Sequence, residues 1–275
     1  MTMKKVLTIA GSDCSGGAGI QADIKTITAH KMYAMSVITA LTAQNTTGVT
    51  SIFEITPEFV GSQLDMVFTD IFPDAVKIGM VASREIIEVI VDRLTYYKPD
   101  NIVIDPVMIS TSGRKLLKDD AIDVLIANLL PLATLITPNI PEAESIYGFS
   151  IDTREDMQRA AALLGDRFHG NILIKGGHLI TGSDDLLYMN GEYRWFNQKN
   201  IHNPNTHGTG CTLSSAIACN LAEGKDMESS VAEAKLYITG AIKDGLDLGK
   251  GRGPLNHTWN ITSGFQPAPQ SPRNH

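Results

Sequence analysis

A glycine-rich loop at residues 205–212 (NTHGTGCT) combines the residue types in this chain that are best suited to binding an anion. It runs directly into the apolar, alanine-rich segment 213–221, a pattern typical of a loop that opens a helix. The first N–H groups of a helix lack partners within the helix and lie at the positive end of its dipole, so they bind anions. Gly208 and Gly210 would let a phosphate approach the backbone closely. The loop therefore indicates a phosphate site, although an ordinary tight turn before a buried helix would have the same pattern.

Cys211 is expected in the first turn of that helix, where the dipole lowers the pKa of a thiol and favours the thiolate. This position predicts a base or a nucleophile beside the bound anion, with a core cysteine as the alternative. His207 precedes the glycines and could also act as a base, but we interpret it as a turn residue. Cys219 lies eight residues after Cys211 and is expected to be an inert core thiol. With Cys14, these are three cysteines without CxxC spacing, which indicates neither a disulfide framework nor a structural zinc site.

Charged side chains are predicted at one edge of a parallel sheet. Asp105 ends a strand-like segment, Glu142 lies in the first turn of the helix after the next strand, and Lys175 ends a further buried strand. The carboxyl ends of parallel strands meet at one edge, so the two carboxylates could hold a magnesium ion through waters. Taken singly, Asp105 could cap a turn and Glu142 could complement a helix dipole. Lys175 is costly at a buried strand end unless its ammonium reaches an anion or a carboxylate, which favours a functional role.

The elements expected to position these residues alternate between strand and helix. Short apolar segments bounded by turn residues predict strands at residues 5–10, 36–43, 75–80, 101–105, 133–137 and 172–177. Helical patterns cover residues 20–27, 57–70, 83–97, 119–130, a segment opening at 139–144, 209–222, and 227 to about 246. This alternation predicts parallel βαβ units. Asn190 and Gly191, between two short apolar segments, predict a type I′ hairpin and hence an antiparallel edge.

A second glycine-rich loop, residues 11–19, follows the first predicted strand. It holds four glycines in nine residues, an entropic cost that a plain turn does not require, so it indicates ligand binding. The loop lacks the Lys and Ser or Thr of a P-loop, and its glycine spacing does not match the dinucleotide fingerprint. Polar amides, Gln44 among them, follow the strand at 36–43, where ligands of open α/β sheets bind.

Composition limits the partners of this protein. The 275 residues carry a formal net charge of −7 and a pI near 5.5, without the basic face that a nucleic acid or an anionic membrane requires. No apolar run approaches the length of a membrane span, and the first residues show no signal-peptide pattern. We therefore expect a cytoplasmic protein that binds a small molecule. One domain is expected over residues 1–261, followed by a disordered tail at 262–275 that lacks apolar periodicity.

Seven motifs in one order resemble those of the bacterial hydroxymethylpyrimidine/phosphomethylpyrimidine kinases of thiamine biosynthesis. They are GSDCSGGAGIQAD (residues 11–23), TAQNT (42–46), KIGM (77–80), DPVM (105–108), TPNIPEAE (137–144), IKGGH (174–178) and HGTGCT (207–212). The resemblance covers about residues 4 to 260. It implies a ribokinase-like fold, a three-layer α/β/α sandwich with a central, mostly parallel sheet and a small antiparallel edge. It also implies two successive ATP-dependent phosphorylations, of 4-amino-5-hydroxymethyl-2-methylpyrimidine and then of its monophosphate, with ATP and Mg²⁺ as cofactors. We further expect a homodimer.

The same resemblance implies roles for individual residues. The family's anion hole is matched by Gly208, Thr209, Gly210 and Cys211, and the cysteine stands where related sugar kinases place a catalytic aspartate, which implies a thiolate base. The pyrimidine pocket is expected to be lined by Asp23, Gln44, Met80 and Val107. On the phosphate side, Asp105 and Glu142 are expected to hold the metal, and Asn139 and Lys175 to contact the nucleotide. Gln44 also fits on chemical grounds, because a carboxamide can donate to a ring nitrogen and accept from the adjacent amino group.

Three other functions fit parts of this pattern. A pyridoxal kinase would share the motifs and a hydroxymethyl-bearing aromatic substrate, but relatives specialised for pyridoxal generally lack the TAQNT run around Gln44; pyridoxal phosphorylation as a second activity stays open. A sugar kinase would carry an aspartate at the position of Cys211. A non-catalytic sensor of a vitamin precursor would need the pocket but not the phosphate-side residues, which this chain retains.

Overall fold

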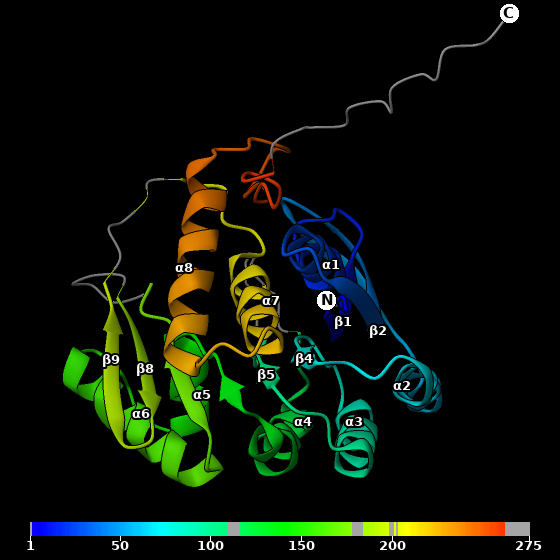
Figure 1. Cartoon of the computed structure of the whole chain (residues 1–275), viewed down its shortest axis with the longest axis horizontal. Helices are drawn as coiled ribbons and strands as arrows, with labels where there is room; N and C mark the ends of the chain where they lie inside the picture. Colours follow the sequence, from blue (N-terminus) through cyan, green and yellow to red (C-terminus); the bar gives the residue numbers. More distant parts are fainter. Residues whose placement is uncertain (1, 109–115, 178–183, 198–200, 202, 262–275) are drawn as a thin grey trace, which may run out of the picture.

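A single nine-stranded sheet runs through the computed structural model, which describes residues 2–108, 116–177, 184–197, 201 and 203–261. Its strand order is β3-β2-β1-β4-β5-β6-β7-β8-β9, and helices cover both faces (Figure 1). This architecture confirms the predicted three-layer α/β/α sandwich. The predicted tail, residues 262–275, lies outside the described residues, and the domain boundary at 261 stays a prediction.

The sheet is parallel in its centre and antiparallel at both edges. Pairs β1-β2, β1-β4, β4-β5, β5-β6 and β6-β7 are parallel, whereas β2-β3, β7-β8 and β8-β9 are antiparallel. The strands are β1 (Lys5–Asp13), β2 (Tyr33–Asn45), β3 (Gly48–Glu54), β4 (Ala75–Ile78), β5 (Ile102–Ile104), β6 (Leu135–Ile136), β7 (Asn171–Ile174), β8 (Asp185–Met189) and β9 (Glu192–Phe196). The prediction of one antiparallel edge is therefore incomplete, because β3 adds a second at the other end of the sheet.

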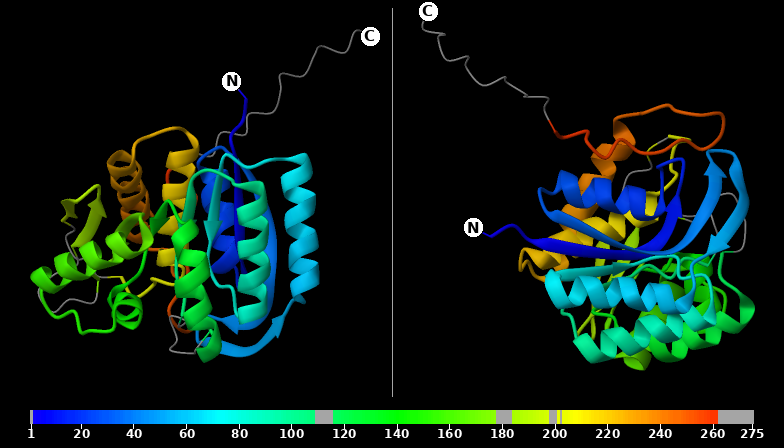
Figure 2. Two further views of the ribbon diagram at one scale, coloured as in Figure 1. Left: turned by 90° about the horizontal axis from the view of Figure 1, so that it is seen from below. Right: turned by 90° about the vertical axis from the view of Figure 1, so that its right-hand side faces the viewer.

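Helices lie on both faces of the sheet (Figure 2), and in the described part of the chain two large hydrophobic clusters are built from the sheet and these helices, beside a small third cluster of Ala40, Met80 and Ala82. The helices are α1 (Gly19–Ala29), α2 (Pro57–Asp70), α3 (Arg84–Tyr97), α4 (Asp119–Val124), α5 (Ile140–Tyr147), α6 (Arg154–Phe168), α7 (Thr209–Ala222) and α8 (Met227–Lys243). Helices α2 to α6 contribute to one core, for example through Leu64 and Leu164, and α1, α7 and α8 to the other, through Ile27, Ile217 and Ile238. Among the helices of the described segments, none combines the length and the apolar character that crossing a bilayer requires.

Helix boundaries follow local capping. Thr56 accepts a hydrogen bond from the N–H of Phe59 and Pro57 takes the first helical position, so α2 starts where its sequence predicts. The predicted helix 119–130 is corrected: α4 ends at Val124 and continues as a π turn, Leu125–Leu129, and a 3₁₀ turn, Leu130–Leu132. Proline at position 131 cannot donate to an α-helical ladder, which accounts for the change of geometry.

The hairpin prediction at Asn190 and Gly191 is confirmed. Both residues have positive φ, 51° and 80°, as a type I′ turn requires, and β8 and β9 pair antiparallel. The hairpin of β2 and β3 was not predicted. Asn45 closes it by accepting hydrogen bonds from the N–H groups of Thr47 and Gly48, and the register shifts between Ala43 and Gln44. Helix α6 was missed as well, although Thr153 and Asp156 form a capping box at its start.

Candidate active site

The glycine-rich loop at residues 205–212, called the anion loop below, opens a helix as predicted, because α7 begins at Thr209 directly after Gly208. Gly208 has φ of 84°, and a Cβ there would lie 1.9 Å from the carbonyl oxygen of Gly17. Only glycine fits this position, because both the backbone conformation and the contact exclude a side chain. The loop at 206–210 thus packs against the glycine-rich loop at 11–19, and the two glycine-rich stretches form one site.

The segments that follow β5 and β7 bring charged side chains to the start of α7. The ammonium of Lys175, after β7, lies 2.7 Å from Oδ1 of Asp105, after β5. A Cβ on Gly210 would lie 3.1 Å from Oδ2 of Asp105 and 3.4 Å from Nζ of Lys175. Burial lowers the pKa of Lys175, but the nearby carboxylates of Asp105 and Glu142 outweigh it and raise that pKa above its ordinary value. The helix start therefore has a positive charge beside it that can meet a phosphate.

Glu142 caps the start of α5, in line with one of its two interpretations from the sequence, and its role as a magnesium ligand stays a prediction. Its carboxylate accepts a hydrogen bond from the N–H of Asn139, and the Asn139 side chain accepts one from the N–H of Glu142, so the pair caps α5. Glu142 is also buried beside Asp105 and Lys175. Burial, with Asp105 adding to it, raises the pKa of Glu142 to about 7, although Lys175 lowers it. A cation at this position would neutralise the two carboxylates.

One cavity of about 940 Å³ connects these groups to the predicted pyrimidine side. Of the predicted site residues, the cavity is lined by Gln44, Met80, Asp105, Val107, Asn139, Glu142, Lys175, Gly208, Thr209, Gly210 and Cys211. Gln44 comes from the end of β2, Met80 follows β4 and Val107 follows β5, so the strand ends that carry the phosphate side also carry the pocket. The sheet edge brings together residues that are up to 167 positions apart, from Gln44 to Cys211.

Comparison with known proteins identifies the family. The family model described as phosphomethylpyrimidine kinase matches residues 13–256. The chain belongs to the phosphomethylpyrimidine kinase family. This confirms the resemblance read from the seven motifs.

Individual members of this kinase family and its neighbours support the same assignment. The hydroxymethylpyrimidine/phosphomethylpyrimidine kinase of Streptomyces coelicolor is 45% identical over 264 residues, 95% of this chain and 97% of that protein. The thiamine biosynthesis bifunctional protein ThiED of Geobacter sulfurreducens is 50% identical over 253 residues, and the chain spans only 52% of its length. An ADP complex of Bacillus subtilis pyridoxal kinase superposes with a TM-score of 0.87 at 36% identity, over 94% of this chain and 99% of that one.

One predicted site residue of this kinase is placed differently. Asp23 is fully buried and does not line the cavity. Its carboxylate accepts hydrogen bonds from Thr8 at 2.6 Å and Ser215 at 2.8 Å, and it forms an ion pair with Lys77 at 2.8 Å. Asp23 therefore does not line the cavity in this structure, and its role in the pyrimidine pocket stays a prediction. The hydrogen bonds of its carboxylate go to side chains of β1, β4 and α7.

The predicted thiolate at Cys211 also needs correction. Removal from water raises the pKa of the thiol to about 11, even though the Lys77 ammonium lowers it. Asp23 and Asp105 raise it further, because they disfavour a second negative charge nearby. Cys211 does lie in the first turn of α7, but its thiol is held mainly in the neutral form. Cys219 is a buried core thiol, as expected.

The part of the cavity lining that β8 and α8 supply was not predicted from the sequence. Beyond Lys175 and Gly177 the cavity is lined by Asp185, Lys235, Ile238 and Ile242 of β8 and α8. Lys235 and Asp185 are both buried and form an ion pair, and Asp185 also accepts a hydrogen bond from the N–H of Gly176. A lysine within the otherwise apolar stretch of α8 was the signal available in the sequence.

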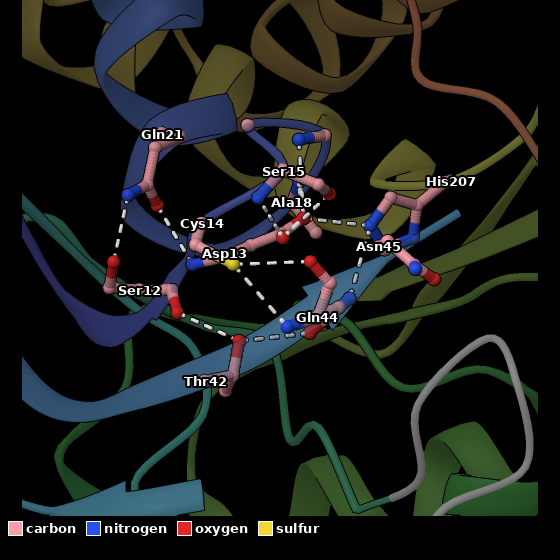
Figure 3. Close-up of polar contacts among 12 residues, drawn as sticks. Ser12, Asp13, Cys14, Ser15, Ala18, Gln21, Thr42, Gln44, Asn45 and His207 are labelled. Carbon is pink, nitrogen blue, oxygen red and sulfur yellow. Dashed lines mark hydrogen bonds and ion pairs between the residues drawn. The ribbon is translucent and has the colours of Figure 1, made fainter. Parts of the chain in front are cut away.

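His207 is more than the predicted turn residue. It is buried, and its Nε2 lies 2.8 Å from Oδ2 of Asp13 and 3.2 Å from the amide nitrogen of Gln44 (Figure 3). Asp13 in turn accepts hydrogen bonds from the N–H groups of Ser15, Gly17 and Ala18. This network joins the loop at 11–19 to both the pyrimidine side and the anion loop.

Proposed function

We propose that this protein transfers the γ-phosphoryl group of ATP to 4-amino-5-hydroxymethyl-2-methylpyrimidine and then to the resulting monophosphate. One observation carries the proposal: a single cavity joins Gln44, Met80 and Val107 at one end to the start of α7, Asp105 and Lys175 at the other. A ring held at the first end would present its hydroxymethyl group to a phosphoryl group held at the second. Positioning of this kind is the main requirement for phosphoryl transfer.

The pyrimidine end can recognise one edge of the substrate. Gln44 lines the cavity and can donate to a ring nitrogen while it accepts from the neighbouring amino group. Met80 and Val107 supply apolar contacts to the ring faces. A Cβ on Gly11 would lie 3.1 Å from Sδ of Met80, so this part of the pocket depends on a glycine.

The phosphate end stabilises negative charge. The N–H groups at the start of α7 and the Lys175 ammonium would bind the oxygens of the transferred group, and these interactions strengthen as charge develops. Within the described residues, no group of three or more His, Cys, Asp or Glu side chains forms a metal cage. Asp105 and Glu142 instead fit the usual magnesium arrangement of one or two carboxylates completed by waters and substrate phosphates. Bound there, Mg²⁺ would neutralise phosphate charge.

The adenine and ribose are assigned to the remaining part of the cavity. Ile238 and Ile242 of α8 offer apolar contact, and Lys235 and Asp185 offer charged groups within reach of polar ligand atoms. Family membership implies the use of ATP, and an ADP complex is described for the Bacillus subtilis pyridoxal kinase. These contacts to the nucleotide, like the magnesium ligands, are our proposal.

Cys211 is assigned the role of base in the first transfer. Its sulfur lines the cavity at the start of α7, where the acceptor hydroxyl would meet the phosphoryl group. Because the thiol is protonated at neutral pH, only the small ionised fraction can take the hydroxyl proton. General-base catalysis of this kind typically contributes about 10²- to 10⁴-fold.

A substrate panel tests the proposal. The purified protein is given ATP and Mg²⁺ with the pyrimidine alcohol, its monophosphate, pyridoxal or pyridoxine, and the products are quantified by chromatography and ³¹P NMR. We expect kcat/KM to be highest for the two pyrimidines. The 36% identity to a pyridoxal kinase makes pyridoxal phosphorylation the second candidate, and a higher kcat/KM for pyridoxal than for the pyrimidine alcohol would reverse the assignment.

The cytoplasmic location and the homodimer expected from the sequence remain proposals. Cell fractionation tests the first, and size-exclusion chromatography with light scattering tests the second.

A further inference from the structure

The Gln44 carboxamide lies between two polar side chains that restrict its orientation. Its oxygen is 3.2 Å from Oγ1 of Thr42, and its nitrogen is 3.2 Å from Nε2 of His207 (Figure 3). Rotation of a carboxamide by 180° exchanges these two positions without moving any other atom. The protons on Thr42 and His207 therefore decide which orientation is stable.

His207 carries its proton on the nitrogen that faces Gln44. Nε2 lies 2.8 Å from Oδ2 of Asp13. Burial raises the pKa of Asp13, but hydrogen bonds from His207 and Ser15 outweigh it and hold that pKa at about 2, so the carboxylate is ionised and can only accept. The nitrogen facing this carboxylate must therefore be an N–H group. An N–H cannot accept a hydrogen bond from the amide nitrogen of Gln44, so the Gln44 atom beside His207 should be the oxygen.

Thr42 leads to the same orientation independently. Its hydroxyl lies 2.9 Å from the carbonyl oxygen of Ser12, to which it donates its single proton. Towards Gln44 the hydroxyl can then only accept, so the Gln44 atom beside Thr42 should be the NH₂ group. Both neighbours thus favour the same rotated carboxamide, in which the single Nε2–H of His207 is shared between Asp13 Oδ2 and the Gln44 oxygen, and the amide nitrogen donates to Thr42.

The neighbours are themselves held firmly. Asp13 is buried and accepts from the backbone N–H groups of Ser15, Gly17 and Ala18 at 2.9 to 3.2 Å. His207 is buried, its own N–H donates to the carbonyl of Gly253 at 3.1 Å, and a Cβ on Gly17 would lie 2.4 Å from its ring. Turning the Asp13 or His207 side chain would break these side-chain hydrogen bonds, which opposes the reverse arrangement of the Gln44 carboxamide.

We propose that Asp13, His207 and Thr42 are positioning residues that hold the Gln44 carboxamide in one orientation, and that this makes the enzyme select a 4-aminopyrimidine over its 4-oxo counterpart. The proposal rests on the contact between Gln44 and the ring put forward above. A 4-amino ring presents a donor beside an accepting ring nitrogen, whereas a 4-oxo ring presents an acceptor beside a ring N–H. A carboxamide that could rotate freely would bind both rings. One held in a single orientation would place its oxygen against the acceptor of the 4-oxo ring and its NH₂ group against the ring N–H.

The discriminating measurement is the ratio of kcat/KM for 4-amino-5-hydroxymethyl-2-methylpyrimidine to that for 5-hydroxymethyl-2-methylpyrimidin-4-one. Reversal of two buried hydrogen bonds predicts a ratio of about 10² to 10⁴ in the unaltered enzyme. His207→Met should reduce it to within about tenfold of unity, whereas His207→Gln, which returns an N–H near the same point, should restore most of it. Thr42→Val should lower the ratio and Thr42→Ser should not. His30→Met, at the histidine that follows the last residue of α1 and does not line the cavity, serves as the control and should leave the ratio unchanged.

Two further variants test the positioning role of His207 and Thr42 separately from the proposed contact between Gln44 and the ring. Gln44→Met should abolish the selectivity, and adding His207→Met to it should have no further effect on the ratio, because the two residues act as one unit. If Gln44→Met leaves the ratio unmoved, the proposed contact with the ring fails. If Gln44→Met abolishes it while His207→Met and Thr42→Val do not, the contact stands and the positioning role is overturned.

The proton position has a readout that needs no substrate. In the ligand-free enzyme, ¹⁵N NMR of the imidazole should show the His207 proton on Nε2. A neutral ring with its only proton on Nδ1 would contradict the inference, even if the substrate ratios behaved as expected.

Discussion

Cys211 shows how strongly a residue's surroundings control its chemistry. Its pKa of about 11 reflects removal from water and two nearby carboxylates, which together outweigh the Lys77 ammonium. About one thiol in 10⁴ is then ionised at pH 7. Only this small ionised fraction can act as a base, and its contribution to catalysis should differ between the two phosphoryl transfers.

Cys211→Ala should impair the first phosphorylation far more than the second. The hydroxymethyl group must lose a proton, so the first turnover is expected to fall about 10²- to 10⁴-fold. The monophosphate already presents an ionised oxygen at pH 8, so the second should change less than about tenfold. Both rates can be measured separately by starting from each substrate.

Cys219→Ala is the matched control and should leave both rates of phosphoryl transfer within a few-fold of wild type. In the unaltered enzyme, kcat/KM for the alcohol should also rise about tenfold per pH unit between pH 7.5 and 9, because only the thiolate takes the proton. A flat profile, or equal loss of both transfers in Cys211→Ala, would remove Cys211 as the base.

Glu142 should make magnesium use depend on pH. Its pKa of about 7 means that the carboxyl is mostly protonated at pH 6 and ionised at pH 8. Since a protonated carboxyl is a poor ligand, the magnesium concentration for half-maximal activity should fall about tenfold from pH 6 to pH 8. The same titration on Glu142→Gln corrects for the nucleotide's own titration. Equal pH dependence in both proteins would exclude Glu142 from the metal site.

At the scale of secondary-structure elements, one buried carboxylate joins four of them. Asp23 of α1 receives hydrogen bonds from Thr8 of β1 and Ser215 of α7, and pairs with Lys77 of β4. Lys77 and Asp23 have no solvent exposure. The group thus holds α7 against the sheet, and the position of the anion loop depends on it.

Asp23→Asn should destabilise the protein rather than weaken substrate binding. It leaves the Lys77 ammonium buried without a charged partner, for which a loss of about 3–5 kcal/mol in the free energy of unfolding is typical. Urea titration measures this loss, with Asp226→Asn at the exposed cap of α8 as a control that should leave the free energy of unfolding nearly unchanged, because asparagine caps a helix about as well as aspartate. A folded Asp23→Asn protein of normal stability, with KM for the pyrimidine raised more than tenfold, would return Asp23 to the pocket.

At the scale of the whole molecule, the C-terminal segment of the described chain closes over α7 and α8. His257 is buried, its Nε2 lies 3.0 Å from Oγ1 of Thr212, and its carbonyl accepts a hydrogen bond from the Tyr237 hydroxyl at 2.6 Å. Burial, with a smaller effect of Lys25, lowers the pKa of His257 to about 4. His257 therefore stays neutral in the folded protein at pH values at which the same histidine is protonated in the unfolded chain.

The free energy of unfolding should fall as pH decreases from about 6.5 to 4. In this window the unfolded histidine binds a proton and the folded one does not, so acid favours unfolding, by up to about 3 kcal/mol at pH 4. His257→Gln should lack this component. Glu142, whose raised pKa acts with the opposite sign, is present in both proteins and cancels in the difference. Parallel stability profiles of the two proteins between pH 4 and 7 would contradict the prediction.

Much of the architecture follows from short-range features of the chain. Helix α2 begins at the Thr56 cap and α7 begins after Gly208, because capping and positive φ are properties of a few neighbouring residues. The type I′ turn at Asn190 and Gly191 is equally local. The order of the motifs along the chain was enough to indicate the family. Of the site residues assigned from these motifs, all but Asp23 line the cavity. Helix α6 and the β2-β3 hairpin carried local signals too, in the cap at Thr153 and the turn at Asn45, and these were missed.

Only the tertiary structure decided the properties that depend on burial and on distant neighbours. Asp23 matches a family motif, but its carboxylate is enclosed by Thr8, Lys77 and Ser215, which lie up to 192 positions away. The thiol of Cys211 is neutral for the same reason, because burial among remote segments, with Asp23 and Asp105 nearby, raises its pKa. The contact between Asp13 and His207 spans 194 positions. Hydrogen-bond partners, proton positions and desolvation arise where the folded chain brings remote segments together, and no spacing along the sequence encodes them.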